Sequence, residues 1–269
     1  MKKINFKILT LKKGVVAVYD FNEIKLHAYQ TYNPMNDELF VLEKKGKAIV
    51  IEAPLFYENI KELEEYIKSL NVSVEGVLLS YHMAGGASFL PEAKRYSSKK
   101  AYETASKGHA REVMKNFANA FGNQIDSAFN SVTNYVKDGE TLTIADIKVT
   151  IKETGDGFDM IFPQINAVYL HMLGHDVHSI VAGNASADEI IAQLTAYAED
   201  GYNLILSSHC APENARDIRT KITYLKNLKK IAAESTSQQE FKSTVQEKYP
   251  AYTGENYLDM TAKFFFPQQ

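Results

Sequence analysis

The segment that most constrains the fold lies between residues 48 and 82, where a helix is placed between two apolar strands. A helix is predicted over residues 57–70 because its apolar side chains repeat on one face: Ile60, Leu63, Ile67 and Leu70. The flanking runs AIVIEAP and EGVLLSYH have the length of strands and few polar residues. A strand, a helix and a strand in this order form a crossover between parallel strands. The chain therefore contains a sheet covered by a helix.

Antiparallel strands are predicted before this crossover and helices after it. The runs FKILTL, GVVAVYDF and IKLHAYQTY precede LFVLEKKGKAIVIEAP, in which the polar EKKGK joins two apolar runs as a hairpin. Residues 97–124 are helical in character. The pattern predicts a packing face made by Val113, Phe117, Ala120 and Phe121.

The second half of the chain repeats this order of elements. GETLTIADIKVTIKETG predicts strands with a turn at Ala145 and Asp146, and a helix is predicted from a capping box at Ser186 and Glu189 to Gly201. The apolar strand YNLILSSH and an amphipathic helix over residues 214–233 follow. Two halves, each with antiparallel strands and a helix-linked strand, predict an α/β fold. Its architecture is a four-layer αββα sandwich in a single domain over residues 1–269.

Charge and cysteine content exclude several classes of function. The 30 Lys and Arg residues nearly balance the 33 Asp and Glu residues, so no strong field favours nucleic acid or an anionic membrane. The single cysteine, Cys210, excludes an internal disulfide and a cysteine-based zinc cluster.

No apolar run has the length of a signal peptide or a membrane span, so we expect a cytoplasmic protein.

Three histidines follow predicted buried strands, and this is the main chemical signal in the chain. His82 follows VLLSY, His171 follows NAVYL, and His209 follows LILSS. Loops at the carboxyl ends of such strands converge on one crevice, where ligands gather. Asp156 stands in a polar turn that closes another strand. Imidazoles and a carboxylate brought together by such loops suit Zn²⁺, with Fe²⁺ and Mn²⁺ as alternatives.

Other interpretations of these residues stay open. A single histidine at a strand end is more often a hydrogen-bonded structural group than a metal ligand. His175, Asp176 and His178 crowd the loop after His171, and Asp176 or His178 is a candidate ligand or general base. A serine nucleophile is disfavoured because the chain has no G-x-S-x-G elbow, and no nucleotide-binding glycine motif is present.

Five stretches occur in an order that resembles the metallo-β-lactamase superfamily over nearly the whole chain. AIVIEAP is similar to the family's acid-ended first strand, with Glu52 as the acid. LLSYHMAGGASFLPEA resembles its histidine loop, glycine pair and helix, and TGDGFDM resembles its third metal-binding turn. In NAVYLHMLGHDVHS, His171 lies close to the sequence position where the family has an aspartate that bridges two metals. LILSSHCAPENARDI is similar to the family's last strand, which ends in a histidine, here His209.

The resemblance implies the αββα fold and a metal-dependent hydrolase. Members usually bind two metals, whereas this chain offers His82, Asp156 and His209, with His171 or Asp176, which suffices for one divalent ion. The Asp-His pair before the glycines is missing. Tyr81 stands where a ligand is expected, and together with Glu52 it is predicted to line the pocket.

The alternative is a non-catalytic binding or structural protein that has the fold without the metal. In either case we expect a small-molecule ligand of unknown identity and no nucleic-acid partner. The three phenylalanines in FFFPQQ either cover the core or make a homodimer contact.

Overall fold

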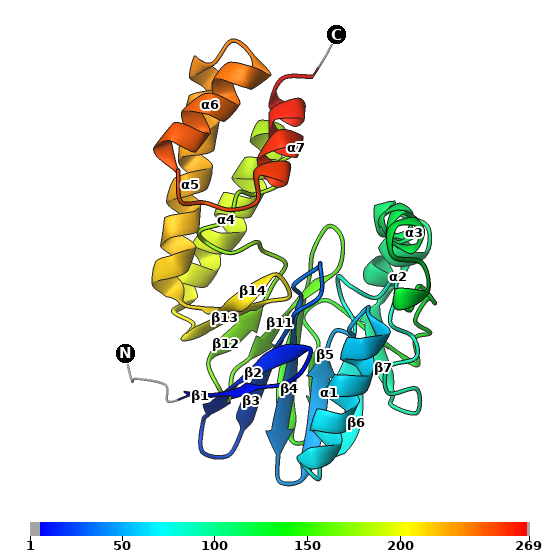
Figure 1. Cartoon of the computed structure of the whole chain (residues 1–269). Helices are drawn as coiled ribbons and strands as arrows, with labels where there is room; N and C mark the ends of the chain where they lie inside the picture. Colours follow the sequence, from blue (N-terminus) through cyan, green and yellow to red (C-terminus); the bar gives the residue numbers. More distant parts are fainter. Residues whose placement is uncertain (1–5, 268–269) are drawn as a thin grey trace. The chain divides into compact units, whose positions relative to one another are not determined.

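The computed structural model describes residues 6–267, and its contacts divide the chain into two compact units (Figure 1). The first unit covers the described residues up to His171 together with Leu206–Pro212. The second covers Met172–Ile205 and the described residues from Glu213 onward. A single domain over residues 1–269 stays a prediction, and each unit is described by itself.

The larger sheet has eight strands, which lie in chain order from edge to edge. Its first five strands pair antiparallel and its last three continue in parallel. Lys45 and Gly46 turn the hairpin between the fourth and fifth strands with positive φ angles of 50° and 76°, as the predicted EKKGK turn requires. The strands are β1 (Phe6–Thr10), β2 (Gly14–Asp20), β3 (Lys25–Thr31), β4 (Glu38–Lys44), β5 (Lys47–Ile51), β6 (Ser73–Leu78), β7 (Arg95–Ser98) and β8 (Asn134–Val136).

The predicted crossover is confirmed by α1 (Tyr57–Ser69), which connects the parallel strands β5 and β6. Its predicted apolar face is buried at Ile60, Leu63 and Ile67. The helix packs on the larger sheet (Figure 1), and the Tyr66 hydroxyl lies 2.7 Å from Nδ1 of His27 in β3. The helix therefore covers one face of this sheet.

The smaller sheet has six strands in the order β14-β13-β12-β11-β10-β9. The predicted turn at Ala145 and Asp146 joins β9 and β10, with positive φ angles of 54° and 59°. A ring contact of 6.0 Å between Phe40 in β4 and Tyr169 in β12 joins the two sheets in the core. The strands are β9 (Thr141–Ile144), β10 (Ile147–Glu153), β11 (Phe158–Phe162), β12 (Ala167–Tyr169), β13 (Leu204–Ser207) and β14 (Cys210–Glu213).

The middle of the chain is helical as predicted, and its packing face is confirmed at Phe117 and Phe121 but not at Val113 and Ala120. It forms α2 (Lys99–Ser106), α3 (His109–Phe121) and the short helix η1 (Gly122–Gln124). Val113 and Ala120 are exposed, whereas Met114, Phe117 and Phe121 pack against a small core. That core consists of Leu55, Phe56 and Ile125. The buried face of α3 therefore includes Met114 in place of Val113.

The second unit contains the helices α4 (Gly183–Asp200), α5 (Ala215–Glu234), α6 (Gln238–Lys248) and α7 (Glu255–Phe265). The predicted capping box at Ser186 is wrong, because α4 begins at Gly183, one turn earlier. Its predicted end at Gly201 is confirmed by a left-handed φ of 73°. A capping box instead begins α5, where the side chains of Asn214 and Asp217 cap each other's backbone N–H groups.

The C-terminal phenylalanines contribute to the packing of the second unit. The rings of Phe265 and Phe266 lie 5.6 Å and 5.8 Å from the ring of Phe241, while Phe264 is exposed. Two of the three therefore pack on α6, and the homodimer contact stays a prediction.

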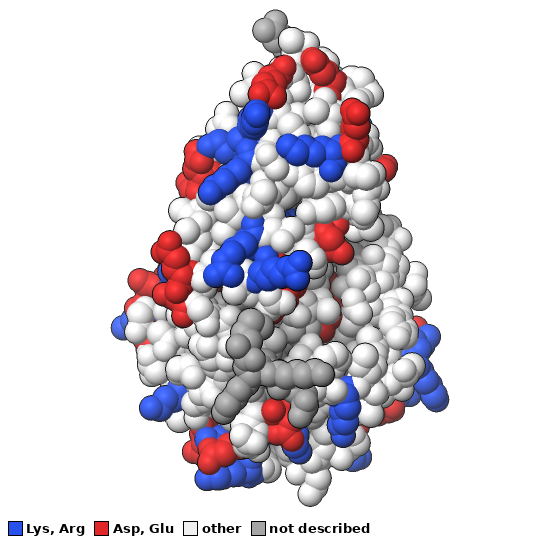
Figure 2. Space-filling view, turned by 90° about the vertical axis from the view of Figure 1, so that its left-hand side faces the viewer, with Lys and Arg blue, Asp and Glu red and all other residues white. Residues whose placement is uncertain are grey.

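The surface carries charges of both signs. On the face in Figure 2, Lys and Arg side chains are interspersed with Asp and Glu side chains. Within residues 6–267, no helix combines the length and the apolar character that a bilayer span requires.

Two buried carboxyl groups at the start of β4 make the stability of the first unit depend on pH. Glu38 is 2% exposed, and its Oε2 atom has no hydrogen-bond partner among the described residues. Burial raises the pKa of Glu38 to about 8, and burial together with the charge of Glu52 raises the pKa of Asp37 to about 7. The folded state therefore holds these protons more tightly than the unfolded chain does.

We expect the free energy of unfolding to fall as the pH rises through 8. A carboxyl group whose pKa is higher in the folded protein than in the unfolded chain stabilises the folded state when it is protonated. This contribution is complete at pH values below the pKa in the unfolded chain, about 4.5, and is lost at pH values above the pKa in the folded protein. Urea unfolding should show a loss of about 2 kcal/mol between pH 6 and pH 9. Glu38→Gln should remove much of this loss, while the exposed control Glu92→Gln should not. An equal pH dependence in all three proteins would contradict this assignment.

Candidate metal centre

The loop after β6, residues 79–82, is held by one buried carboxylate. Glu52 follows β5, and its side-chain oxygens accept hydrogen bonds from the backbone N–H groups of Ser80, Tyr81 and His82 at 2.8–3.3 Å. The Tyr169 hydroxyl donates to the same carboxylate at 2.9 Å. A single side chain thus fixes three consecutive peptide groups, the last of which carries His82.

Glu52 is itself held in an unfavourable environment. It is fully buried, and its backbone has a φ of 62°, a left-handed conformation that costs a residue with a Cβ atom about 1 kcal/mol or more. Burial raises the pKa of Glu52 to about 7, while its N–H and O–H donors oppose the shift. Such strain at a strand end indicates that the loop conformation is maintained for a site.

The glycine pair after His82 is required by close backbone contacts. A Cβ atom on Gly86 would lie 2.7 Å from the carbonyl oxygen of Pro54, and the φ of this residue is +79°. A Cβ atom on Gly85 would lie 2.8 Å from the carbonyl oxygen of Asp126. The glycines therefore let the loop pack against the chain just after Glu52.

Three of the predicted ligands, His82, His171 and His209, converge within the first unit. The Nε2 atom of His209 lies 3.3 Å from Nε2 of His82 and 2.8 Å from Nε2 of His171. Within residues 6–267, they form the one group of three or more potential ligands whose donor atoms all lie within 4.8 Å of one another. The three histidines follow β6, β12 and β13, so the structure brings together the strand ends that the sequence singled out.

The chemistry of this cluster fits a divalent cation. Burial and the neighbouring imidazole of His171 lower the pKa of His82 to about 3. Desolvation also lowers the pKa of His171, although part of this residue is exposed, and burial together with the imidazoles of His82 and His171 lowers the pKa of His209 well below its ordinary value. Neutral imidazole is the form that binds metal. Nitrogen ligands of tetrahedral zinc lie about 3.3 Å apart, which is the separation of the His82 and His209 Nε2 atoms, while Nε2 of His171 lies closer to His209 at 2.8 Å.

Tyr81, predicted to line the pocket, lies against the cluster. Its ring stacks on the imidazole of His171 with the centroids 4.6 Å apart and an interplanar angle of 13°. Its hydroxyl donates to Oδ1 of Asp159 at 2.7 Å and lies 2.9 Å from Oγ1 of Thr154. Tyr81 therefore contacts a ligand through its ring and the β10–β11 turn through its hydroxyl.

Asp156, the predicted fourth ligand, lies outside the histidine cluster. Its side chain is exposed, and Oδ1 lies 3.9 Å from Nδ1 of His109, the first residue of α3. Its charge nevertheless acts on His171, where it opposes part of the lowering of the pKa by desolvation. Ligation by Asp156 stays a prediction.

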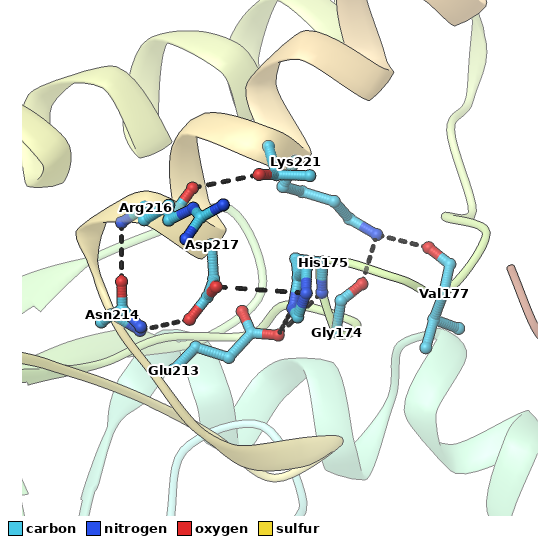
Figure 3. Close-up of polar contacts among 9 residues, drawn as sticks. Gly174, His175, Val177, Glu213, Asn214, Arg216, Asp217 and Lys221 are labelled. Carbon is cyan, nitrogen blue, oxygen red and sulfur yellow. Dashed lines mark hydrogen bonds and ion pairs between the residues drawn. The ribbon is translucent and has the colours of Figure 1, made fainter. Parts of the chain in front are cut away.

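The other residues of the loop after His171 belong to the second unit. The Nδ1 atom of His175 lies 2.8 Å from Oε1 of the buried Glu213, and its Nε2 atom lies 4.0 Å from Oδ1 of Asp217 (Figure 3). Asp176 is exposed. His178 is buried, with Nδ1 2.9 Å from the Tyr224 hydroxyl. A catalytic role for Asp176 or His178 stays a prediction.

Several supporting residues were missed from the sequence. Tyr169 and Ser80 are buried, and Tyr169 lies 2.9 Å from both Glu52 and Ser208. Ser80 donates to the carbonyl oxygen of Phe158 and accepts from its N–H. The one available signal was position, because Tyr169 and Ser80 each precede a candidate histidine by two residues.

Comparisons with solved structures identify the fold. A sec-alkylsulfatase from Pseudomonas sp. superposes with a TM-score of 0.63 at 14% identity, over 90% of this chain and 49% of that one. A metallo-β-lactamase family protein from Thermus thermophilus gives 0.61 at 14% identity, over 90% and 91% of the two chains. A metallo-β-lactamase from Erythrobacter litoralis gives 0.55 at 12% identity, over 82% of this chain and 100% of that one.

These similarities confirm the predicted metallo-β-lactamase fold. The chain spans about half the length of the alkylsulfatase and nearly the whole length of the other two proteins. No protein-family model matches the sequence, and neither does any curated protein. At identities of 12–14%, the likeness concerns the fold.

Substitution of Glu52 tests whether its carboxylate holds the histidine loop. Glu52→Ala leaves one buried and two partly buried N–H groups without their acceptor and creates a cavity, so unfolding in urea should show a loss of about 3–5 kcal/mol. Glu52→Gln keeps one acceptor oxygen and should lose about 1–2 kcal/mol. The control Glu65→Ala, on the exposed face of α1, should stay within about 0.5 kcal/mol of the wild type. Wild-type stability in Glu52→Ala would disprove this role.

Proposed function

We propose that the protein is a metal-dependent hydrolase with a single divalent ion bound by His82, His171 and His209. The observation that carries the proposal is the convergence of three neutral Nε2 atoms, each from a different strand end of the first unit. Three imidazoles with an open fourth position are the ligand set of a catalytic zinc site, while Fe²⁺ and Mn²⁺ are the alternatives.

The residues present determine what the site can do. A divalent ion held there would lower the pKa of a bound water toward about 7 and polarise a substrate oxygen. Glu52 keeps His82 in place, and the Nε2 atoms of all three rings face one another. His171 has an exposed edge, so this side of the site is open to a ligand. Asp156, whose charge acts on His171, is the candidate for a fourth ligand.

The substrate class follows only from the neighbours, so several classes need testing. One neighbour is named as a stereoselective inverting sec-alkylsulfatase, and another as a metallo-β-lactamase exposed to ceftazidime. A first panel is therefore a secondary alkyl sulfate, a cephalosporin and a simple carboxylic ester. Each requires water to attack a polarised centre, which is the chemistry that a metal site with an open position supplies.

A metal-free binding protein is the second candidate. Tyr81 favours it, because the family resemblance implies a metal ligand at this position of the loop, whereas the tyrosine ring there stacks on His171. In that case the fold would hold a small molecule without hydrolysing it. Metal binding separates the two candidates.

Metal content after reconstitution tests the proposal. We expect about one equivalent of Zn²⁺, Fe²⁺ or Mn²⁺ per chain by elemental analysis, with titration calorimetry giving the affinity. His82→Ala and His209→Ala should each weaken binding at least about 100-fold, because two imidazoles remain. The exposed His109→Ala, outside the cluster, is the matched control and should bind nearly as the wild type does. A reconstituted wild type without metal above background would overturn the proposal in favour of the binding protein.

A further inference from the structure

We infer that Tyr81 is a positioning residue that orients the His171 imidazole for metal binding, and that the β10–β11 turn exists to hold Tyr81. This inference rests on the proposed metal site. The sequence TGDGFDM, which resembles the family's third metal-binding turn, was predicted to supply a metal ligand. According to this inference, the turn contributes to the site by holding Tyr81.

His171 needs support from outside the cluster. It lies beyond the end of β12, outside any regular element, and its residue is exposed. Within the described part of the chain, its ring contacts are with Tyr81, His82 and His209. Two of these are fellow ligands. Tyr81 therefore supplies the aromatic contact that fixes the plane of the His171 ring independently of the other two imidazoles.

Tyr81 is anchored at both ends of its side chain. Its backbone N–H donates to Oε1 of Glu52 at 2.8 Å, and its hydroxyl donates to Oδ1 of the fully buried Asp159 at 2.7 Å. The one hydroxyl proton is used on Asp159, so the Thr154 hydroxyl donates to the Tyr81 oxygen at 2.9 Å. Thr154 in turn accepts from the N–H of Gly157 at 3.2 Å. The chain of hydrogen bonds leaves the ring little freedom.

The β10–β11 turn is shaped to receive this side chain. A Cβ atom on Gly157 would lie 3.0 Å from two atoms of the Tyr81 ring and 2.7 Å from Oγ of Ser80. Ser80 also forms two hydrogen bonds with Phe158, at 2.7 Å and 2.8 Å. Glycine at 157 thus makes room for Tyr81, and Ser80 fixes the turn to the histidine loop. The turn contributes to the site through this docking.

The stacking geometry favours the metal-bound form of His171. An imidazole that binds a cation carries part of its positive charge, and the face of an aromatic ring attracts such charge. The nearly parallel rings, at an angle of 13°, place the phenol face against the imidazole face. A ring held in its binding orientation also loses less entropy when metal binds. Both effects act through His171, because the Tyr81 hydroxyl is bonded to the turn.

Variants of Tyr81 separate positioning from general packing. Tyr81→Ala removes the stack and the anchor, and its Zn²⁺ dissociation constant, measured by competition with a chromogenic chelator, should rise about 10–100-fold. Tyr81→Phe keeps the stack, so its affinity should fall only about fivefold. Gly157→Ala displaces the ring without touching a histidine and should also weaken binding. Tyr32→Ala, at a tyrosine that is 58% exposed, is the matched control and should bind as the wild type does.

Two further measurements report on His171 itself. In ¹H–¹⁵N spectra of the metal-free protein, the ring-current shift of the His171 imidazole should be lost in Tyr81→Ala and kept in Tyr81→Phe. The absorption spectrum of Co²⁺-substituted protein should change in Tyr81→Ala in the same way as in His171→Ala. Circular dichroism and thermal unfolding establish that each variant is folded.

The outcomes are distinguishable from failure of the proposed function. Unchanged affinity and an unchanged His171 signal in a folded Tyr81→Ala protein would overturn the inference while leaving the metal site intact. Absence of Zn²⁺ binding in the wild type would overturn the proposed function. In that case the imidazole spectra of the metal-free proteins still decide whether Tyr81 orients His171.

Discussion

The site depends on the hydrogen bonds between the Glu52 carboxylate and the three backbone N–H groups of residues 80–82. Glu52 is fully buried and has a positive φ of 62°, so its position costs conformational energy. In this position, the Glu52 carboxylate fixes the backbone of Tyr81 and of His82. Because Tyr81 then reaches His171 and the β10–β11 turn, one carboxylate orders both sides of the histidine cluster.

The fold was largely predictable because it follows from local patterns. The α1 face, the Lys45–Gly46 turn and the end of α4 at Gly201 each follow from apolar spacing or a required backbone conformation. The errors have physical causes. Ser186 matches a capping motif, yet α4 begins one turn earlier at Gly183. Val113 has the spacing of a core residue, but α3 presents Met114 and Phe117 to the small core instead.

The site was predictable only in part. His82, His171 and His209 could be selected because each follows an apolar strand, and carboxyl ends of strands gather at one edge. The supporting contacts depend on tertiary packing. Nothing in the sequence shows that Tyr81 stacks on His171 or that Gly157 leaves space for it. Sequence position also does not show that Asp156 lies beside His109, or that His178 is buried against Tyr224 in the second unit.

The central claim is that three histidines of the first unit bind one divalent ion, and zinc-edge anomalous diffraction tests it most directly. Crystals of Zn²⁺-reconstituted protein should show a single anomalous peak about 2.0–2.1 Å from the Nε2 atoms of His82, His171 and His209. A peak at another group of residues, two peaks at the cluster, or an empty cluster in crystals that hold zinc elsewhere would contradict the account.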